Sequence, residues 1–261
     1  MDLDLTGKHA LVCGGSEGIG RATAVELAQL GASVTLLARR EGALREAMAS
    51  LPCSGNQQHD VLVADVAQTF ELSQTVAAHA AVRRVHILVN NTGGPPGGSA
   101  HAAEIGAYLD AFNKHLIANQ TLLQAVLPGM RDAQWGRIVN VISTSVYEPI
   151  ANLGVSNTIR GAVASWAKTL SKELGSDGIT VNNVLPGYTS TQRLEQILAD
   201  RSAATGKSQD EVAKGMLATV PAGRFAQAHE VAGVIAFLCC PAAAYVNGQS
   251  LAVDGGRMQS I

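Results

Sequence analysis

A glycine-rich turn near the start of the chain carries the clearest chemical signal in this sequence. A short apolar run at 10–13 is followed by Gly14, Gly18 and Gly20, and a helical pattern runs over 19–30. In the order strand, turn, helix, the free N–H groups of the turn and the helix N-terminus bind an anion such as a nucleotide phosphate. The first gap between glycines is one residue longer than in the common dinucleotide fingerprint, so an ordinary strand-to-helix turn is the alternative.

Two arginines after the next expected strand indicate which nucleotide the turn binds. In such a site, a carboxylate at the end of that strand accepts the ribose hydroxyls, whereas an arginine accommodates a 2′-phosphate. Arg39 and Arg40 stand where the carboxylate would be, and a guanidinium holds phosphate through two parallel hydrogen bonds. We therefore expect NADP(H) to be preferred, with NAD(H) possible. Glu17 adds an opposing charge to the turn, and two solvated arginines at a strand end are the alternative.

Polar residues also follow the third and fourth expected strands. Asp65 and Val66 are positioned to flank an adenine edge, while Asp65 is equally suited to cap the helix that follows. Asn91, Thr92 and Gly93 come after the fourth strand. Small polar residues and glycines at the carboxyl end of a strand can line a cofactor cleft.

These groups need alternating strands and helices to bring them together. The 261 residues, of which 47% are hydrophobic and only 4% aromatic, suit one α/β domain spanning 1–261 with buried parallel strands. Apolar runs predict strands at 8–13, 33–38, 59–64, 86–91, 137–143, 179–185 and 249–253. Helical patterns predict helices at 18–30, 41–50, 68–82, 107–132, 155–175 and 229–239. Right-handed crossovers then give a doubly wound parallel sheet whose ligands lie at the carboxyl ends of its strands.

Charge and composition argue against several functions. A net charge of −2 without Lys/Arg clusters argues against nucleic acid or anionic membrane as a partner. No apolar run reaches the ~18 residues of a membrane span, and the first residues do not resemble a signal peptide. The four cysteines lack metal-site spacing and are interpreted as small buried residues in a reducing compartment. We expect a cytoplasmic protein that binds a small-molecule substrate and no metal.

Five motifs in order carry a specific resemblance. They are Gly14-x3-Gly18-x-Gly20, Asn90-Asn91-Thr92-Gly93, the run 136–143, the run 181–187 and Val253-Asp254-Gly255-Gly256. Together they resemble the short-chain dehydrogenase/reductase family, in its bacterial 3-oxoacyl-carrier-protein-reductase-like branch. The resemblance implies a seven-stranded Rossmann-type sheet, a nicotinamide cofactor, hydride transfer at a carbonyl or alcohol carbon, and a homotetramer or dimer. The cofactor-binding residues expected are Gly14, Ser16, Glu17, Gly18, Ile19, Gly20, Arg39, Arg40, Asp65, Val66, Asn91, Thr92, Gly93, Arg160, Pro186, Gly187 and Thr189.

The catalytic residues implied by the resemblance are mostly replaced. The family uses an Asn, a Ser and a Tyr-x3-Lys pair, in which the Ser holds the substrate oxygen, the Tyr exchanges its proton and the Lys lowers the Tyr pKa. Ser143 occupies the Ser position, but Ser156 stands for the Tyr, Arg160 for the Lys and His115 for the Asn. An aliphatic hydroxyl is too weak an acid to replace a phenol near neutral pH. Arg160 can bind the ribose hydroxyls but cannot relay a proton as a lysine can.

Other residues are candidates for the missing proton donor. Tyr147 lies four residues after Ser143, in the loop beyond that strand, and His115 belongs to a residue type that ordinarily titrates near neutrality. Tyr188 follows the 186–187 dipeptide, near the expected nicotinamide face. Each of these side chains also has an ordinary packing or hydrogen-bonding role as its alternative.

The segment 189–225 is expected to form a substrate lid, with one amphipathic stretch over 191–204 and a second helix over 208–218. Its basic residues suit a carboxylate or phosphate, but interleaved acidic residues favour an ordinary solvated surface. The sequence thus predicts an NADP(H)-preferring oxidoreductase with an altered proton donor, acting on a 3-oxoacyl-type or small ketone substrate. The alternative is a cofactor-binding, catalytically impaired family member that serves as a regulatory or partner subunit.

Overall fold

The computed structural model describes residues 1–260, and its centre is a single sheet of seven parallel strands in the order β3-β2-β1-β4-β5-β6-β7. The predicted seven-stranded, doubly wound α/β fold is confirmed. Every predicted strand is present, with ends that differ by no more than a few residues. The strands are β1 (His9–Cys13), β2 (Ser33–Ala38), β3 (Asp60–Val63), β4 (Ile87–Asn90), β5 (Gly136–Val141), β6 (Ile179–Pro186) and β7 (Ser250–Val253).

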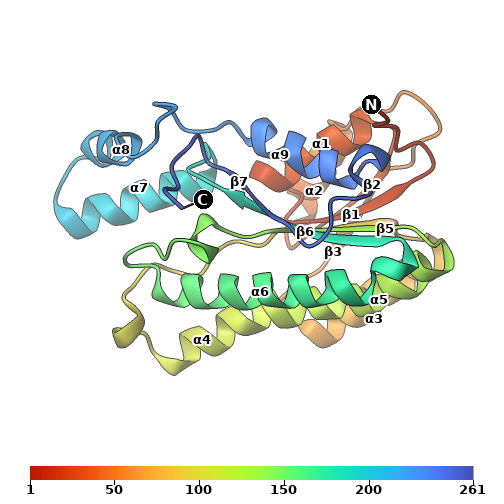
Figure 1. Ribbon diagram of the computed structural model, residues 1–261, viewed down its shortest axis with the longest axis horizontal. Helices are drawn as coiled ribbons and strands as arrows, with labels where there is room; N and C mark the ends of the chain where they lie inside the picture. The colour runs from red at the N-terminus through yellow and green to blue at the C-terminus, as the bar shows by residue number, and fades with distance from the viewer. Residues whose placement is uncertain (261) are drawn as a thin grey trace.

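Helices cover both faces of the sheet (Figure 1). One layer holds α1 (Gly18–Gln29), α2 (Glu41–Ala49) and α9 (Ala228–Cys239), and the other holds α3 (Thr69–Val82), α4 (Ile105–Phe112), α5 (Ala118–Asp132) and α6 (Gly154–Glu173). Aliphatic side chains of the central strands pack against each layer and form two separate core clusters. Four short 3-10 turns join these elements, at Ala100–Ala102, Thr144–Val146, Gly175–Asp177 and Pro241–Ala243.

The long helix predicted over 107–132 is interrupted. A π-helical turn, Asn113–Ile117, separates α4 from α5 and contains His115. A π turn holds one residue more than an α turn and is often found at functional sites. Here the wider turn lets the Asn113 amide donate to the Ala67 carbonyl at 2.8 Å while His115 is buried under the carboxyl end of β4.

An amide ladder crosses four strands, from the last residue of β4 to the first residue of β7. Asn90, Asn140, Asn183 and Ser250 are register partners on β4, β5, β6 and β7. Each asparagine donates from Nδ2 to the next side chain, at 2.8, 2.9 and 3.0 Å. The ladder therefore holds the strands that carry the family motifs in one fixed register.

Two helices, α7 (Gln192–Thr205) and α8 (Gln209–Leu217), extend beyond the carboxyl ends of the strands, at the left of Figure 1. Gly206, with φ of +72°, ends α7 in the left-handed region, as expected for the predicted break there. A reciprocal capping box between Ser208 and Glu211 starts α8. The lid role of this segment stays a prediction.

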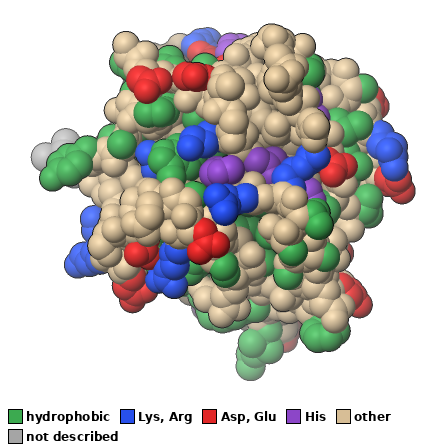
Figure 2. Space-filling view, turned by 90° about the vertical axis from the view of Figure 1, so that its right-hand side faces the viewer, with side chains coloured by type: hydrophobic (Ala, Val, Ile, Leu, Met, Phe, Trp, Pro, Cys, Tyr) green, Lys and Arg blue, Asp and Glu red, His purple; other side chains and the backbone are tan. Residues whose placement is uncertain are grey.

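The opposite end of the sheet faces the viewer in Figure 2, where histidine, lysine and arginine side chains gather. The hydroxyl of Thr35 lies 2.8 Å from Nε2 of His9 and 3.2 Å from Nε2 of His79, so two histidines share one buried partner. Among residues 1–260, no helix combines the length and apolar character that crossing a membrane requires. The expectation that the cysteines are buried is wrong for Cys53, which is exposed on the loop before β3.

Candidate functional site

The glycine turn is packed against the end of β4. Gly14 has a φ of +60°, and a Cβ there would lie only 2.5 Å from the backbone oxygen of Asn91. Asn91 in turn donates from Nδ2 to the carbonyl of Cys13 at 3.4 Å. A side chain at position 14 would therefore collide with Asn91, so this turn requires glycine there.

The loop after β6 lies over the same turn. A Cβ on Gly18 would lie 3.2 Å from Cγ2 of Thr191, and Gly187 comes so close to Asp254 that a Cβ would lie 2.7 Å from its Cα. Thr189 is buried and donates to the Gly187 carbonyl at 3.2 Å. The expected cofactor residues from the turn and from 186–189 are thus adjacent in the fold. Among the expected cofactor residues, Ser16, Ile19, Val66, Thr92 and Pro186 are half-buried and Gly93 is exposed.

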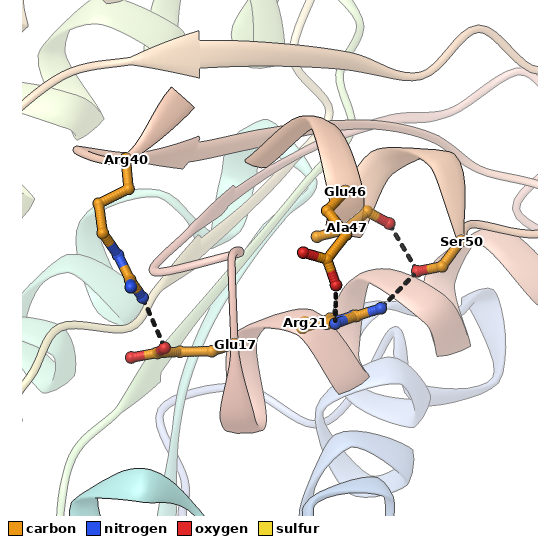
Figure 3. Close-up of polar contacts among 6 residues, drawn as sticks. All are labelled: Glu17, Arg21, Arg40, Glu46, Ala47 and Ser50. Carbon is orange, nitrogen blue, oxygen red and sulfur yellow. Dashed lines mark hydrogen bonds and ion pairs between the residues drawn. The ribbon is translucent and has the colours of Figure 1, made fainter. Parts of the chain in front are cut away.

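The two arginines after β2 have different partners. Arg40 donates to the carboxylate of Glu17 at 2.7 Å, across the gap between the glycine turn and the start of α2 (Figure 3). Arg39 instead borders a surface pocket of about 340 Å³ together with Val63, Ala64 and Asp65. Because Arg40 neutralises Glu17, the opposing charge expected in the turn is already paired.

Asp65 lies in the turn before α3 and does not cap that helix. Its carboxylate accepts the N–H of Ala67 at 2.9 Å, two residues before α3 begins at Thr69, and the N-cap residue of α3 is Gln68, so the capping alternative is wrong. Asp65 also borders the pocket next to Arg39. Its contact with an adenine stays a prediction.

His115 is buried at the end of β4. Its Nδ1 lies 2.6 Å from the hydroxyl of Thr92, and only 2% of the residue is exposed. Burial, with the nearby charges of Arg160 and Lys114, lowers the pKa of His115 to about 3. The expectation that this histidine titrates near neutrality is therefore wrong, and the ring is neutral at physiological pH.

Arg160 is buried between the ends of two strands. Its Nη1 donates to the carbonyl of Val141 at 2.9 Å and its Nη2 to the carbonyl of Thr92 at 3.3 Å. Its Nε has no partner among the described residues. Burial, and secondarily the charge of Arg193, lowers the pKa of Arg160 to about 10. The guanidinium still carries its charge at neutral pH, in the position that the resemblance assigns to a lysine.

Both candidate serines precede this arginine in the chain. Ser143 follows β5 and is half-buried, and its hydroxyl accepts the N–H of Ser145 at 3.1 Å. Ser156 lies in the first turn of α6, four residues before Arg160, so both point from one face of the helix. The structure thus brings Ser156 and Arg160 to one helix face at the end of β5, where Ser143 also lies.

The tyrosines are directed elsewhere in this conformation. Tyr147 is 52% exposed, and its hydroxyl donates to the Ser250 carbonyl at 3.3 Å, at the free edge of the sheet beside β7. Tyr188 packs edge-on against Phe225 and lies 4.7 Å beneath the guanidinium carbon of Arg257.

Two further arginines contact the loops that follow β4 and β5, at the carboxyl end of the sheet. Arg193, in the first turn of α7, donates to the carbonyl of Pro95 at 2.9 Å, and Arg257 donates to the hydroxyl of Thr144 at 3.3 Å. The sequence marked Arg193 only as one of several lid charges, and nothing in the sequence singled out Arg257. Both contacts join segments that are far apart in the chain, so local patterns do not reveal them.

Comparison with known proteins identifies the family. A family model described as enoyl-(acyl carrier protein) reductase matches residues 14–257. The 3-oxoacyl-[acyl-carrier-protein] reductase FabG of Pseudomonas aeruginosa is 34% identical over 266 residues, covering 99% of this chain and 100% of that protein. The chain belongs to the short-chain dehydrogenase/reductase family. The resemblance inferred from the five motifs is therefore confirmed.

Solved structures of short-chain dehydrogenases/reductases agree with this fold. The L-sorbose reductase of Gluconobacter frateurii, complexed with NADPH and L-sorbose, is 28% identical with a TM-score of 0.92, and the similarity covers 100% of both chains. A variant of actinorhodin polyketide ketoreductase with NADPH is 32% identical with a TM-score of 0.90, covering 97% of this chain and 98% of that chain. Both of these oxidoreductases were solved with NADPH.

Proposed function

We propose that this short-chain dehydrogenase/reductase binds NADP(H) and interconverts a carbonyl and a secondary alcohol by hydride transfer. The observation that carries the cofactor assignment is that the two arginines after β2 have different surroundings. Arg40 pairs with Glu17, whereas Arg39 borders the pocket beyond β2, where its charge can meet a 2′-phosphate. NADPH in the structures of the sorbose and polyketide ketoreductases supports it.

The residues present fit this cofactor. No side chain caps the start of α1 at Gly18, which leaves the first N–H groups of this helix available to a pyrophosphate. Arg39 would bind the 2′-phosphate, and the segments after β4 and β6 would line the nicotinamide end. When bound, the nicotinamide supplies or accepts the hydride.

On the substrate side, Ser143 holds the carbonyl oxygen and the charge of Arg160 favours negative charge developing on that oxygen. Neutral His115 does not supply the proton, because its pKa is lowered to about 3. Tyr147 is the proposed proton donor. Its bond to the Ser250 carbonyl, at 3.3 Å, is longer than a usual O–H···O hydrogen bond, so little is lost when the phenol turns toward the substrate.

The activity is tested by following NADPH oxidation with small ketones and 3-oxoacyl thioesters, and with 2-enoyl thioesters because the matching family model is named for enoyl reductases. Turnover of a ketone or 3-oxoacyl thioester is the expected result. Tyr147→Phe should then lower kcat by roughly 10²-fold, the usual contribution of a positioned acid. An unchanged kcat would overturn the role of Tyr147 while leaving hydride transfer in place.

A cofactor-binding subunit without turnover is a second candidate function. It is favoured by Ser156 and Arg160, which replace the family's Tyr-x3-Lys pair, and by the two backbone carbonyls that already hold Arg160. Tight NADPH binding combined with no oxidation across the whole panel would support this second function.

We also propose a homodimer or homotetramer built on the layer of α4, α5 and α6. Ile105, Leu109 and Phe112 are spaced to share one side of α4 and are 77%, 65% and 38% exposed. An exposed apolar stripe of this kind is typical of a protein–protein contact. Sedimentation at micromolar concentration should show an oligomer that Leu109→Lys weakens, and a monomeric wild type would contradict the proposal.

A further inference from the structure

Two arginine side chains from distant segments meet beside Gly94. Nη2 of Arg160 and Nη2 of Arg193 each lie 3.7 Å from the point where a Cβ on Gly94 would sit. The two guanidinium groups therefore flank the same point. A glycine at 94 leaves that space free of side-chain atoms.

These two positive charges are not neutralised by the protein. Within residues 1–260, no ion pair joins either arginine to a carboxylate, and their hydrogen bonds go to the backbone oxygens of Val141, Thr92 and Pro95. Arg160 is only 7% exposed, and its Nε is buried without a partner. A buried charge without a counter-charge is costly, and a site that retains one commonly uses it to bind an anion.

The topology places this pair over the expected reaction centre. Arg193 follows β6 and contacts Pro95, which follows β4, while β5 lies between these two strands. The guanidinium of Arg193 shares the space beside Gly94 with Arg160, and Arg160 bonds to Val141 at the end of β5, the strand that Ser143 follows. An anion held here lies next to the carbonyl that Ser143 would hold.

We propose that the substrate carries a carboxylate, which Arg160 and Arg193 hold between them, so that the protein reduces oxo acids in preference to neutral ketones. This inference rests on the proposed hydride-transfer function. The carbonyl carbon of the oxo acid gains the hydride and its oxygen gains a proton, giving a hydroxy acid, while NADPH is oxidised and the carboxylate is unchanged. Planar guanidinium groups match the two oxygens of a carboxylate.

The cofactor's pyrophosphate is the other oxyanion that this pair of arginines is chemically suited to bind. The glycine turn that suits a pyrophosphate follows β1, whereas Arg160 bonds to the end of β5 and to the residue two positions after β4. The sheet order places β4 between β1 and β5, which favours the substrate side for Arg160.

Matched pairs of substrates test the proposal: pyruvate, acetoacetate and 4-oxopentanoate, each against its methyl ester. At least one acid should exceed its ester in kcat/KM by roughly 10-fold or more, and Arg193→Gln should remove most of that ratio without changing the Kd of NADPH. Arg193 is used because replacing Arg160 also frees two backbone carbonyls. Arg201→Gln, on the same helix α7, is the matched control and should preserve the ratio.

Two outcomes would overturn the proposal: equal rates for every acid and its ester, or an Arg193→Gln variant that loses NADPH affinity while the acid-to-ester ratio stays the same. The second outcome assigns the arginines to the pyrophosphate. If no compound is turned over, calorimetry can still test the carboxylate site by measuring the binding of 3-hydroxybutanoate and of its methyl ester to the NADP⁺ complex. Binding of the acid alone, lost in Arg193→Gln, supports the carboxylate site even where the proposed reductase activity fails.

Discussion

The carboxylate of Glu17 accepts a hydrogen bond from the guanidinium of Arg40 at 2.7 Å, and this contact joins the glycine turn to the first residues after β2. Both side chains remain largely solvated, at 48% and 64% exposure. The pair therefore adds little to stability, since exposed ion pairs contribute about 0–1 kcal/mol. Its effect is electrostatic: it neutralises one arginine and one acid beside the expected 2′-phosphate, and the charge of Arg39 remains at the pocket.

Arg39→Gln should weaken NADPH binding roughly 10- to 100-fold and leave NADH binding nearly unchanged. A charge-assisted hydrogen bond to phosphate is worth about 1.5–3 kcal/mol, and NADH has no phosphate at that position. Fluorescence titration of both cofactors measures the effect. Arg45→Gln is the matched control, because Arg45 lies on the same segment but pairs with Glu41. Equal losses for NADPH and NADH would remove Arg39 from the phosphate site.

Glu17→Gln should strengthen NADPH binding several-fold. The change removes a negative charge from the turn and frees Arg40 from its ion pair. The charge of Arg40 can then attract the 2′-phosphate of NADPH. The free energy of unfolding should change by less than about 1 kcal/mol, because the pair is exposed. Titration with NADPH and denaturation by urea measure the two effects. Weaker NADPH binding would show that Glu17 orients Arg40 rather than competing with the phosphate.

His115→Asn should make the free energy of unfolding less dependent on pH in the acidic range. The folded pKa of about 3 lies below the ordinary value of 6.5, so the unfolded chain binds more protons between these two values. The contribution of His115 is complete above about pH 6.5 and is lost as pH falls toward 3, at up to about 1.4 kcal/mol per pH unit.

The measurement for His115→Asn is urea unfolding near pH 5 and near pH 8. The variant should keep part of the pH dependence, because burial lowers the pKa of both His9 and His86 to about 4. The difference in unfolding free energy between the two pH values should be smaller in the variant. His101→Asn, at an exposed histidine, controls for the loss of an imidazole. An equal difference in His115→Asn and the wild type would contradict the buried, neutral state of this ring.

Restoring the family pair with Ser156→Tyr and Arg160→Lys should raise ketone reduction, because it supplies a phenol one helix turn before residue 160. In a Tyr147→Phe background, which lacks the proposed donor, the gain should reach roughly 10²- to 10⁴-fold, the contribution of a positioned acid or base, and it should be smaller where Tyr147 already donates the proton. Ser156→Ala alone should change turnover little, since an aliphatic hydroxyl is too weak an acid. A collapse of activity in Ser156→Ala would refute that reasoning.

The sequence predicted the fold well because each strand is a mainly apolar run that a glycine, a polar cluster or a helical pattern ends. It also located the glycine turn, Arg39 and Ser143, since a family motif or a strand end marks each of them. It did not reveal the π turn at Asn113–Ile117, because the residues of that turn have no pattern that separates them from an α-helix. Whether Glu17 is paired, and where Arg193 reaches, depends on contacts between segments distant in the chain.

The amide ladder from Asn90 to Ser250 has a direction. Every Nδ2 in the ladder donates toward β7, so the side-chain dipoles point the same way and polarise one another. The row of hydrogen bonds begins at Asn90, whose Oδ1 is buried without a partner among the described residues. If one of these strands slips by one residue, its ladder side chain turns to the other face of the sheet, and the neighbouring side chains lose their hydrogen-bond partner. The two carbonyls that hold Arg160 belong to Val141, the last residue of β5, and to Thr92, just after β4. The Asn90–Asn140 rung of the ladder therefore also sets how these two carbonyls are aligned with each other.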